Sequence, residues 1–236
     1  MIDKNRFIQE AARLGVAVSD QQAAMLDAYV KKMIETNKSM NLTAITDPRE
    51  IEIKHLLDCA VLCALPELGK EVTDVGTGAG FPGVVIKVLR PELDLTLIDA
   101  TAKKLSFVEQ ACREIGIEVK ILHGRAEEIA RREHRETYDT VVSRAVAQLC
   151  SLAEYCLPLV KVGGFFVAMK GPEAAQETAE SLYAIKEMGG SEPLVENFSL
   201  PGGIERVLVK IKKISQTPSK YPRNGKNVSK NPLKNR

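Results

Sequence analysis

The residues best suited to chemistry form a glycine-rich run, DVGTGAGFPG, at positions 74–83. The alternating glycines Gly76, Gly78 and Gly80 let a backbone turn tightly and approach a ligand where a Cβ atom would collide. Pro82 suits the first turn of a helix that follows the loop. A loop of this kind suits a nucleoside-bearing cofactor, which would lie over the carboxyl ends of parallel strands.

Two nucleoside cofactors fit such a loop, a dinucleotide and S-adenosylmethionine. The last three glycines of the run match the dinucleotide fingerprint. Pyrophosphate at a helix N-terminus needs no acid in the preceding strand, yet Asp74 stands there, where its carboxylate can receive a methionine ammonium directly or through water. Asp99, 23 residues after Gly76, can accept from ribose hydroxyls in either case. Asp74 therefore favours S-adenosylmethionine.

Two further polar segments follow strand-like runs. HGRAE at positions 123–127 lies where a loop would pass an adenine, with backbone amides and the Glu127 carboxylate nearby. Glu127 can equally be an ordinary acid in the first turn of a helix. SRAV at positions 143–146 follows the next strand, so Arg144 is expected to point toward cofactor or substrate. The alternative is a surface arginine paired with Asp139 or Glu127.

Residues that the chain lacks disfavour two kinds of methylation. Methylation of exocyclic amines usually relies on an Asn/Asp-Pro-Pro-aromatic segment after the fourth strand, where this chain has SRA. Methylation of pyrimidine C5 needs a cysteine nucleophile, whereas Cys150 and Cys156 fall within the next helix pattern and are expected in the core. A ring nitrogen such as guanine N7 carries a lone pair and no proton, so its methylation needs alignment but no general base.

Short β-rich runs alternate with helix-compatible stretches from position 71 onward, which predicts βαβ units with helices on both faces of a parallel sheet. These runs are 72–75, 95–98, 119–122, 140–142 and 165–168. Residues 195–200 and 206–214 are strand-like but separated by Pro-Gly-Gly alone, which predicts an antiparallel hairpin. A mostly parallel, doubly wound α/β sheet that ends in such a hairpin is typical of class I (Rossmann-like) methyltransferases. It also lacks the second mononucleotide-binding half of a dehydrogenase.

An N-terminal helical extension is predicted before this sheet. Ser19 and Gln22 form a capping box for a helix that runs to about position 36. Asp47 is expected to cap a second helix, with Pro48 at its first position and Glu50 closing the box. The buried stripe of that helix is predicted to contain Ile51, His55, Leu56, Cys59 and Leu62.

The composition, 44% hydrophobic and 27% charged over 236 residues, is that of a globular protein. No apolar run approaches the roughly 20 residues that span a bilayer, and the N-terminus lacks the layout of a secretory signal. A cytoplasmic protein without membrane contact is therefore expected. The five cysteines form no Cys-x-x-Cys pair and no metal cluster, so free thiols and no metal are expected.

The net charge of +2 is unevenly distributed. Residues 215–236 carry six basic and no acidic side chains, which leaves 27 basic and 31 acidic residues in the rest. A basic tail on a mildly acidic body is expected where the tail touches nucleic acid, and a solubilising disordered end is the alternative. The expected parts are a helical extension (1–66), a methyltransferase domain (67–214) and a basic tail (215–236).

Six motifs in matching order resemble the 16S ribosomal RNA guanine-N7 methyltransferases, a family once called glucose-inhibited division protein B. They are NLTAI at 41–45, KHLLD at 54–58, the glycine-rich run, SRAV at 143–146, MKG at 169–171 and KYPR at 220–223. The resemblance spans nearly the whole chain. It implies methyl transfer from S-adenosylmethionine to N7 of a guanine, with 16S ribosomal RNA or the 30S subunit as partner.

The same resemblance implies roles for individual residues. Beside Asp74, Gly78 and Gly80 of the loop, it assigns cofactor binding to Gly76, Phe81, Asp99, Ala100, Thr101, Ala126, Glu127 and Arg144. The candidates for catalysis or base positioning are Asn41, His55 and Lys170, and those for RNA contact are Thr43, Lys220, Tyr221 and Arg223. His55 is equally compatible with a packed core histidine. Tyr221 and Arg223 are equally compatible with a tail docked on its own domain.

Other functions stay open on the sequence alone. They are a methyltransferase for a small molecule or protein, an RNA or ribosome assembly factor that binds S-adenosylmethionine without turnover, and a nicotinamide dehydrogenase. The basic tail disfavours the first, the intact glycines and acids disfavour the second, and the terminal hairpin disfavours the third. The protein is expected to be monomeric.

Overall fold

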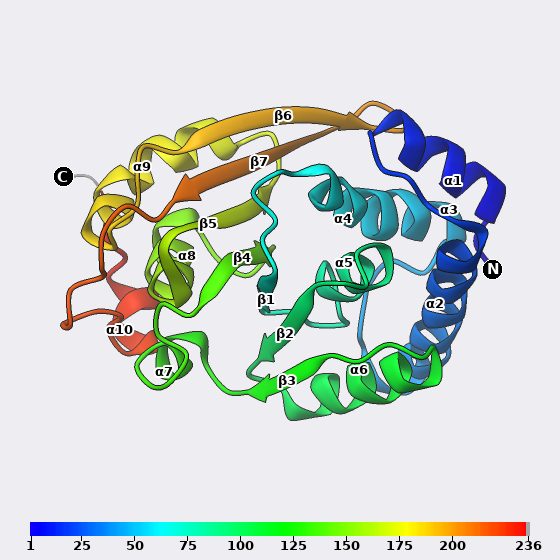
Figure 1. Ribbon diagram of the computed structural model, residues 1–236, viewed down its shortest axis with the longest axis horizontal. Helices are drawn as coiled ribbons and strands as arrows, with labels where there is room; N and C mark the ends of the chain where they lie inside the picture. Colours follow the sequence, from blue (N-terminus) through cyan, green and yellow to red (C-terminus); the bar gives the residue numbers. More distant parts are fainter. Residues whose placement is uncertain (235–236) are drawn as a thin grey trace.

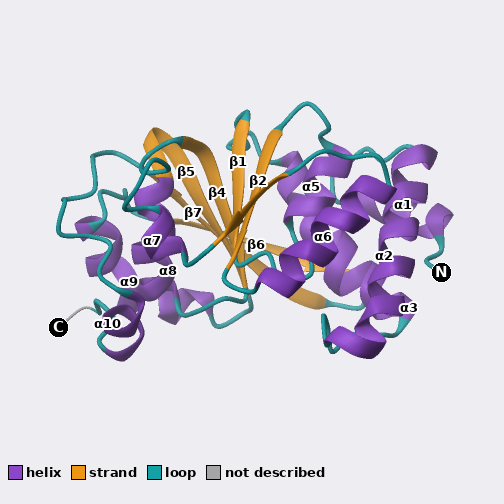
Figure 2. Cartoon of the chain, turned by 90° about the horizontal axis from the view of Figure 1, so that it is seen from below, coloured by secondary structure: helices purple, strands orange, loops and turns teal. Residues whose placement is uncertain are grey.

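A seven-stranded sheet runs through the molecule between two layers of helices (Figures 1 and 2). The computed structural model describes residues 1–234, so the last two residues of the basic tail lie outside the described part. The strands are β1 (Glu71–Val75), β2 (Asp94–Asp99), β3 (Lys120–His123), β4 (Tyr138–Arg144), β5 (Val160–Lys170), β6 (Leu194–Leu200) and β7 (Ile204–Lys212). Every predicted strand is therefore present.

The strand order is β3-β2-β1-β4-β5-β7-β6, and only β7 and β6 pair antiparallel with their neighbours. The predicted doubly wound sheet with a terminal hairpin is confirmed. The order reverses between β1 and β4, and ligands of such sheets bind beyond the carboxyl ends of the strands at this reversal. The loops that follow β1, β2, β3 and β4 meet there.

Figure 2 shows the helices divided between the two faces of the sheet. One face carries α1 (Lys4–Arg13), α2 (Asp20–Met40), α3 (Pro48–Ile51), α5 (Gly83–Leu89) and α6 (Ala102–Glu114). The other carries α7 (Ala126–Ile129), α8 (Leu149–Cys156), α9 (Ala174–Glu187) and α10 (Gly225–Lys230). A short 3₁₀ turn, η3 (Leu157–Leu159), links α8 to β5. No helix of the described residues is long and apolar enough to cross a membrane.

Two helices of the extension, α2 and α3, begin where their capping residues predict. The side chains and backbones of Ser19 and Gln22 form the full capping box of α2, which continues to Met40. Asp47 caps α3 by accepting from the backbone N–H of Glu50. The prediction that Glu50 closes a second box is wrong, because its carboxylate pairs with Lys54 one turn along.

The helix that starts at α3 changes its hydrogen-bond pattern along its length. It continues as a π-helix, η1 (Glu52–Leu57), then as α4 (Asp58–Ala60) and a 3₁₀ turn, η2 (Val61–Ala64). The five residues of the predicted stripe are all buried. π-Helical turns are rare and often accompany functional sites. Here the π-helical stretch carries His55 and the backbone carbonyl of Lys54 toward the sheet.

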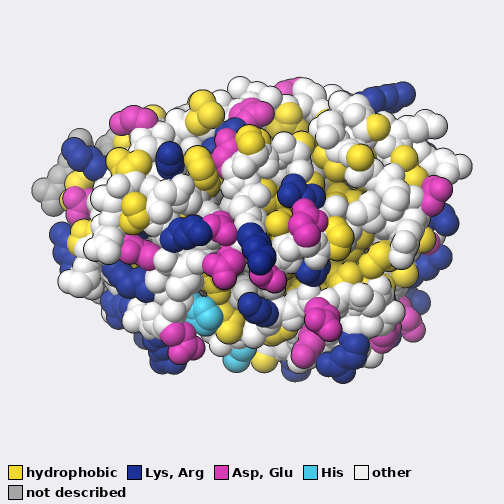
Figure 3. All heavy atoms as spheres, viewed as in Figure 1, with side chains coloured by type: hydrophobic (Ala, Val, Ile, Leu, Met, Phe, Trp, Pro, Cys, Tyr) yellow, Lys and Arg dark blue, Asp and Glu magenta, His cyan; other side chains and the backbone are white. Residues whose placement is uncertain are grey.

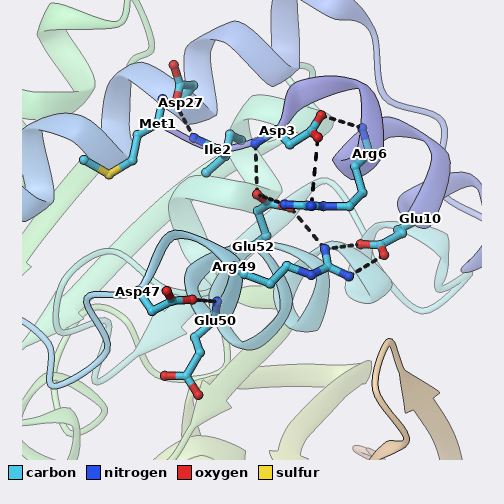
Figure 4. A network of polar contacts seen from close by, with 10 residues as sticks. All are labelled: Met1, Ile2, Asp3, Arg6, Glu10, Asp27, Asp47, Arg49, Glu50 and Glu52. Carbon is cyan, nitrogen blue, oxygen red and sulfur yellow. Dashed lines mark hydrogen bonds and ion pairs between the residues drawn. The ribbon is translucent and has the colours of Figure 1, made fainter.

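Ion pairs attach the start of the chain to this helix (Figure 4). Arg6 of α1 donates to the carboxylate of Glu52, which is 1% exposed, and Arg49 donates to both Glu10 and Glu52. The N-terminal ammonium pairs with Asp27 of α2. Apolar contacts continue the attachment inward, and the extension shares one hydrophobic core with α5, α6 and the sheet.

The basic tail is docked on the domain. Arg135 donates to the carbonyls of Thr217 and Tyr221, and Arg223 forms a bidentate pair with Glu154, whose side chain is fully buried. The hydroxyl of Tyr221, itself buried, donates to Glu187. Of the two interpretations of Tyr221 and Arg223, the structure shows the tail docked on its own domain, and their contact with RNA stays a prediction.

Candidate active site

A cavity of about 550 Å³ opens at the carboxyl ends of β1, β2, β3 and β4. Its lining contains most of the residues expected to bind the cofactor: Gly76, Gly78, Asp99, Ala100, Thr101, Ala126, Glu127 and Arg144. Four loops that are distant in sequence thus meet at one place. We call this space the first cavity.

The three loop glycines have different surroundings. All have positive φ values, 75° for Gly76, 57° for Gly78 and 90° for Gly80. A Cβ added at Gly78 would meet nothing closer than the Gly76 carbonyl oxygen at 3.9 Å, so it would extend into the first cavity. A Cβ at Gly80 would instead collide with the hydroxyl of Tyr29 on α2. Gly78 therefore leaves room for a ligand, while Gly80 leaves room for the helical extension.

Two carboxylates stand on the cavity wall. Asp99 accepts from the backbone N–H of Gly78 at 2.9 Å and from that of Thr101 at 2.8 Å, and each oxygen retains a lone pair for a ligand. Glu127 lies in the first turn of α7 with only 7% exposed. Carboxylates on neighbouring loops, beside a stretch of open backbone, fit the hydroxyls and polar edge of an adenosyl group.

Asp74 does not line the first cavity. Its side chain is fully buried and accepts from the backbone N–H of Gly83 at 2.9 Å, while Oδ1 has no hydrogen-bond partner among the described residues. Burial raises the pKa of this carboxyl to about 6. The carboxylate thus faces the start of α5, and its expected contact with the methionine ammonium, direct or through water, stays a prediction.

Phe81 also lies behind the loop, outside the lining of the first cavity. Its ring stacks on that of His55 with centroids 4.8 Å apart and lies edge-on to Tyr29. The guanidinium of Arg144 sits 5.6 Å from the same ring. Phe81 thus joins the glycine-rich loop to the helical extension.

Arg144 lies at the centre of the polar contacts. It donates to the carbonyl oxygen of Lys54 at 2.9 Å and to Nδ1 of His55 at 3.2 Å, and pairs with Asp58 at 3.4 Å. The alternative pairing with Asp139 or Glu127 is not found, and the partner in α4 is Asp58. The next residue, Ala145, has a φ of 55°, a strained conformation for a side-chain-bearing residue and one that accumulates near functional sites.

A second cavity of about 340 Å³ lies on the other side of Arg144 and Ala145, which line both spaces. Its remaining lining residues are Ile45, Lys54, His55, Asp58, Met169, Lys170, Gly171 and Arg206. Lys170, a predicted site residue, lines it while donating to the Ala147 carbonyl at 2.8 Å and pairing with Glu177 at 2.9 Å. The fold thus brings His55, Lys170 and Arg144 together.

His55 is held neutral in this arrangement. Burial and then the charge of Arg144 lower its pKa to about 4. Because Nδ1 accepts from Arg144, the proton resides on Nε2, which donates to the hydroxyl of Thr43 at 2.9 Å. His55 is both a packed histidine and a cavity residue, so its two interpretations coexist.

Asn41 and Thr43 line neither cavity. Asn41 is exposed and ends α2 in the left-handed conformation, with a φ of 51°. Thr43 is bound through its backbone to the side chain of Asn37 and through its hydroxyl to His55. Both residues therefore shape the loop that supports His55, rather than presenting a side chain to either cavity.

Some residues that line the cavities could not be predicted, because no pattern in the sequence distinguishes them from their neighbours. Tyr155 of α8 and Ser229 of α10 line the first cavity, and Arg206 of β7 lines the second. Arg206 also pairs with Asp58 at 3.3 Å. An alternating strand pattern marks Arg206 only as a surface position, and Ser229 reaches the cavity only because the tail docks.

Comparison with known proteins adds sequence relatives of nearly equal length. A profile of the family described as rRNA small subunit methyltransferase G matches residues 22–200. The protein named ribosomal RNA small subunit methyltransferase G from Alkaliphilus metalliredigens is 46% identical over 227 residues, which cover 94% of this chain and 95% of that protein. Its namesake from Pelotomaculum thermopropionicum is 45% identical, with 96% and 97% covered.

Solved structures show the same fold at low identity. An O-methyltransferase from Bacillus cereus in complex with SAH has a TM-score of 0.54 at 14% identity, covering 79% of this chain and 91% of that one. An O-methyltransferase from Thermotoga maritima has a TM-score of 0.51 at 15% identity, covering 78% and 72%. These likenesses concern the fold alone.

Proposed function

The chain belongs to the rRNA small subunit methyltransferase G family, and from that membership we propose that it methylates N7 of a guanine in bacterial 16S ribosomal RNA. The donor is S-adenosylmethionine, which supplies an electrophilic methyl group on a positively charged sulfur. The observation that carries the proposal is the pair of cavities on either side of Arg144. The first cavity has room for the donor, and the second would give a base access to the donor's methyl group.

In the proposed complex the first cavity holds the donor. Gly76 and Gly78 leave the backbone open, Asp99 and Glu127 accept from hydroxyl or amino groups, and Ala100, Thr101 and Ala126 add backbone contacts. Asp74, Gly80 and Phe81, which the sequence suggested as cofactor-binding residues, are proposed to act on the cofactor only indirectly. These three residues support the loop from behind, through α5, Tyr29 and His55 respectively.

The chemistry needs no proton acceptor, because N7 of guanine attacks through a lone pair. The structure is consistent with this requirement, since the one imidazole at the second cavity has its Nδ1 occupied by Arg144. Rate enhancement then comes from holding nucleophile, methyl carbon and sulfur in line. Arg144, fixed by three partners at the junction, would define where the two reactants meet.

The proposed RNA contacts differ from the sequence expectation. With Tyr221 and Arg223 occupied, the exposed basic residues in the described part of the tail are Lys220, Lys226, Lys230 and Lys234. Figure 3 shows basic side chains gathered over α7 and α10, at the left of the view. We propose that this surface meets the phosphate backbone of the 16S RNA, free or within the 30S subunit, and that the enzyme acts as a cytoplasmic monomer.

The test is transfer of a radiolabelled methyl group from S-adenosylmethionine to 30S subunits from cells that lack this methylation, followed by mapping of the labelled base. We expect one labelled guanine, with the label at N7. Subunits that already carry the modification serve as the matched control and should stay unlabelled. Label on protein alone, on a small molecule, or nowhere would overturn the proposed function.

A further inference from the structure

The second cavity contains one carboxylate among several cations. Asp58 is the sole acidic residue in its described lining, which also contains Lys54, Arg144, Lys170 and Arg206. Asp58 itself pairs with Arg144 and Arg206. Its side chain comes from α4, at the end of the π-helical stretch, and is only 4% exposed. A carboxylate this deeply buried is costly unless its oxygens are well satisfied.

The two oxygens of Asp58 are unequally satisfied. Oδ2 accepts from Arg144, whereas Oδ1 has no hydrogen-bond partner among the described residues and only a 3.3 Å ion pair with Nε of Arg206. A carboxylate accepts up to about four hydrogen bonds. Asp58 therefore has spare acceptor capacity, at an oxygen that is itself buried, in the lining of the second cavity, which adjoins the first cavity.

Guanine is the base whose chemistry matches this acceptor. Its N1–H and exocyclic N2 amino group are two neighbouring donors, which a carboxylate can receive together. Adenine and cytosine offer an amino group beside a ring acceptor, which a carboxylate would repel. Methylation at N7 also places a positive charge on the guanine ring, so contact with a carboxylate strengthens in the transition state.

We propose that the second cavity receives the target guanine, with the Asp58 carboxylate accepting from its N1–H and N2 amino groups. The proposal rests on the proposed function and adds the residue that selects the base. Arg144 remains paired with Oδ2 and keeps Asp58 in place. Lys54 and Arg206, at the same cavity, are placed to meet the phosphates of the flipped nucleotide.

The test compares guanine with inosine, which lacks only the N2 amino group and retains N7, O6 and N1–H. Undermethylated 30S subunits are reconstituted with 16S RNA that carries either base at the mapped position. Wild-type enzyme is expected to prefer guanine by at least about tenfold in kcat/KM, because inosine loses one hydrogen bond to a charged acceptor. Equal rates on the two RNAs would overturn the proposal without any variant being made.

Asp58→Asn is the informative variant, and Asp139→Asn is its matched control. Asp139 also belongs to an ion pair, with Lys161, but it lies at the end of β4 opposite Arg144. Asp58→Asn is expected to lower kcat/KM on guanine at least about tenfold and to abolish most of the preference over inosine, with unchanged S-adenosylmethionine affinity by calorimetry. Asp139→Asn should retain both the rate and the preference.

The outcomes separate base recognition from a purely structural role. If Asp58 only positions Arg144, the Asp58→Asn variant will bind S-adenosylmethionine more weakly while it keeps the full preference for guanine, and the proposal fails. If wild-type enzyme methylates neither RNA although it binds the donor, the proposed function fails first. Activity on guanine RNA without discrimination against inosine removes only the role of Asp58.

Discussion

Individual residues of the glycine-rich loop have two different roles: some border the first cavity, and others pack against the helical extension. Gly78 borders the first cavity, whereas Gly80 touches Tyr29 of the extension, although the two are indistinguishable in the sequence. The same division separates Asp99, on the cavity wall, from Asp74, buried beneath the loop. The sequence pattern therefore predicts where a site lies, but the role of each residue depends on the direction in which its side chain points.

Substitutions at these two glycines should have different effects. Gly78→Val fills space that a ligand would occupy, and at positive φ it also strains the backbone locally. We expect loss of S-adenosylmethionine binding in calorimetry with the fold retained in circular dichroism. Gly80→Ala, which collides with Tyr29, is expected to lower the free energy of unfolding by about 1–3 kcal/mol. Equal binding defects in two equally stable variants would contradict this division.

The buried His55 gives a pH signature. Its pKa falls from 6.5 in the unfolded chain to about 4 in the folded protein, so the unfolded state binds more protons between these values. The stability that neutral His55 contributes is complete above pH 6.5 and is lost as the pH falls toward 4, by up to about 3 kcal/mol.

His55→Asn should remove this dependence. Measured by urea denaturation, the difference in unfolding free energy between wild type and variant is expected to shrink as the pH is lowered from 7 to 4. The raised pKa of Asp74, which acts in the opposite direction, is present in both proteins and cancels in the difference. A difference that stays constant over this range would show that His55 is not buried as described.

At the scale of elements, the docked tail completes the wall of the first cavity. Ser229 of α10 lines the first cavity, and Gly225 lies so close to Glu127 that a Cβ atom there would collide with its carboxylate. The tail is held by Arg223, which pairs with the fully buried Glu154. A segment that looked like a flexible basic end is thus part of the cavity wall.

Arg223→Met should detach this element. Because it leaves the Glu154 carboxylate buried and unpaired, we expect a loss of about 3–5 kcal/mol in unfolding free energy, together with weaker S-adenosylmethionine binding. Lys220→Met is the control, since the Lys220 side chain is 67% exposed and pairs only loosely with Glu187. Equal, small effects of the two substitutions on stability would rule out a docked tail.

Regular elements could be predicted from the sequence because their signals are local. Alternating β-rich runs located β1 to β5, the two strand-like runs around Pro-Gly-Gly located β6 and β7, and Ser19 with Gln22 located the start of α2. The placement of Asp74, Phe81 and Arg223 depends on which distant element packs against each, and no local pattern contains that information. The π-helical stretch was missed for the same reason, since its residues fit an ordinary helix equally well.

At the scale of the whole molecule, the extension and the sheet are expected to unfold together. Leu26 and Tyr29 of α2 belong to the same buried cluster as Val84 and Phe107 of the α/β part. Because this cluster joins the extension to one face of the sheet, the extension is not an independent unit that could melt first. Calorimetry should show a single transition whose van't Hoff and calorimetric enthalpies agree. Two separate transitions, or a protease-resistant core without residues 1–66, would contradict this expectation.

The position of Arg144 between two cavities has a consequence for product release. In the proposed reaction the sulfur loses its positive charge and the base gains one, so a unit charge crosses from one side of the guanidinium to the other. The methylated base would then lie among Lys54, Arg144, Lys170 and Arg206, with Asp58 as the one acidic residue in the described lining of the second cavity. In the first cavity, the sulfonium charge that Asp99 and Glu127 attracted is meanwhile lost. The charges that attract the two reactants therefore weaken the binding of both products and favour their release.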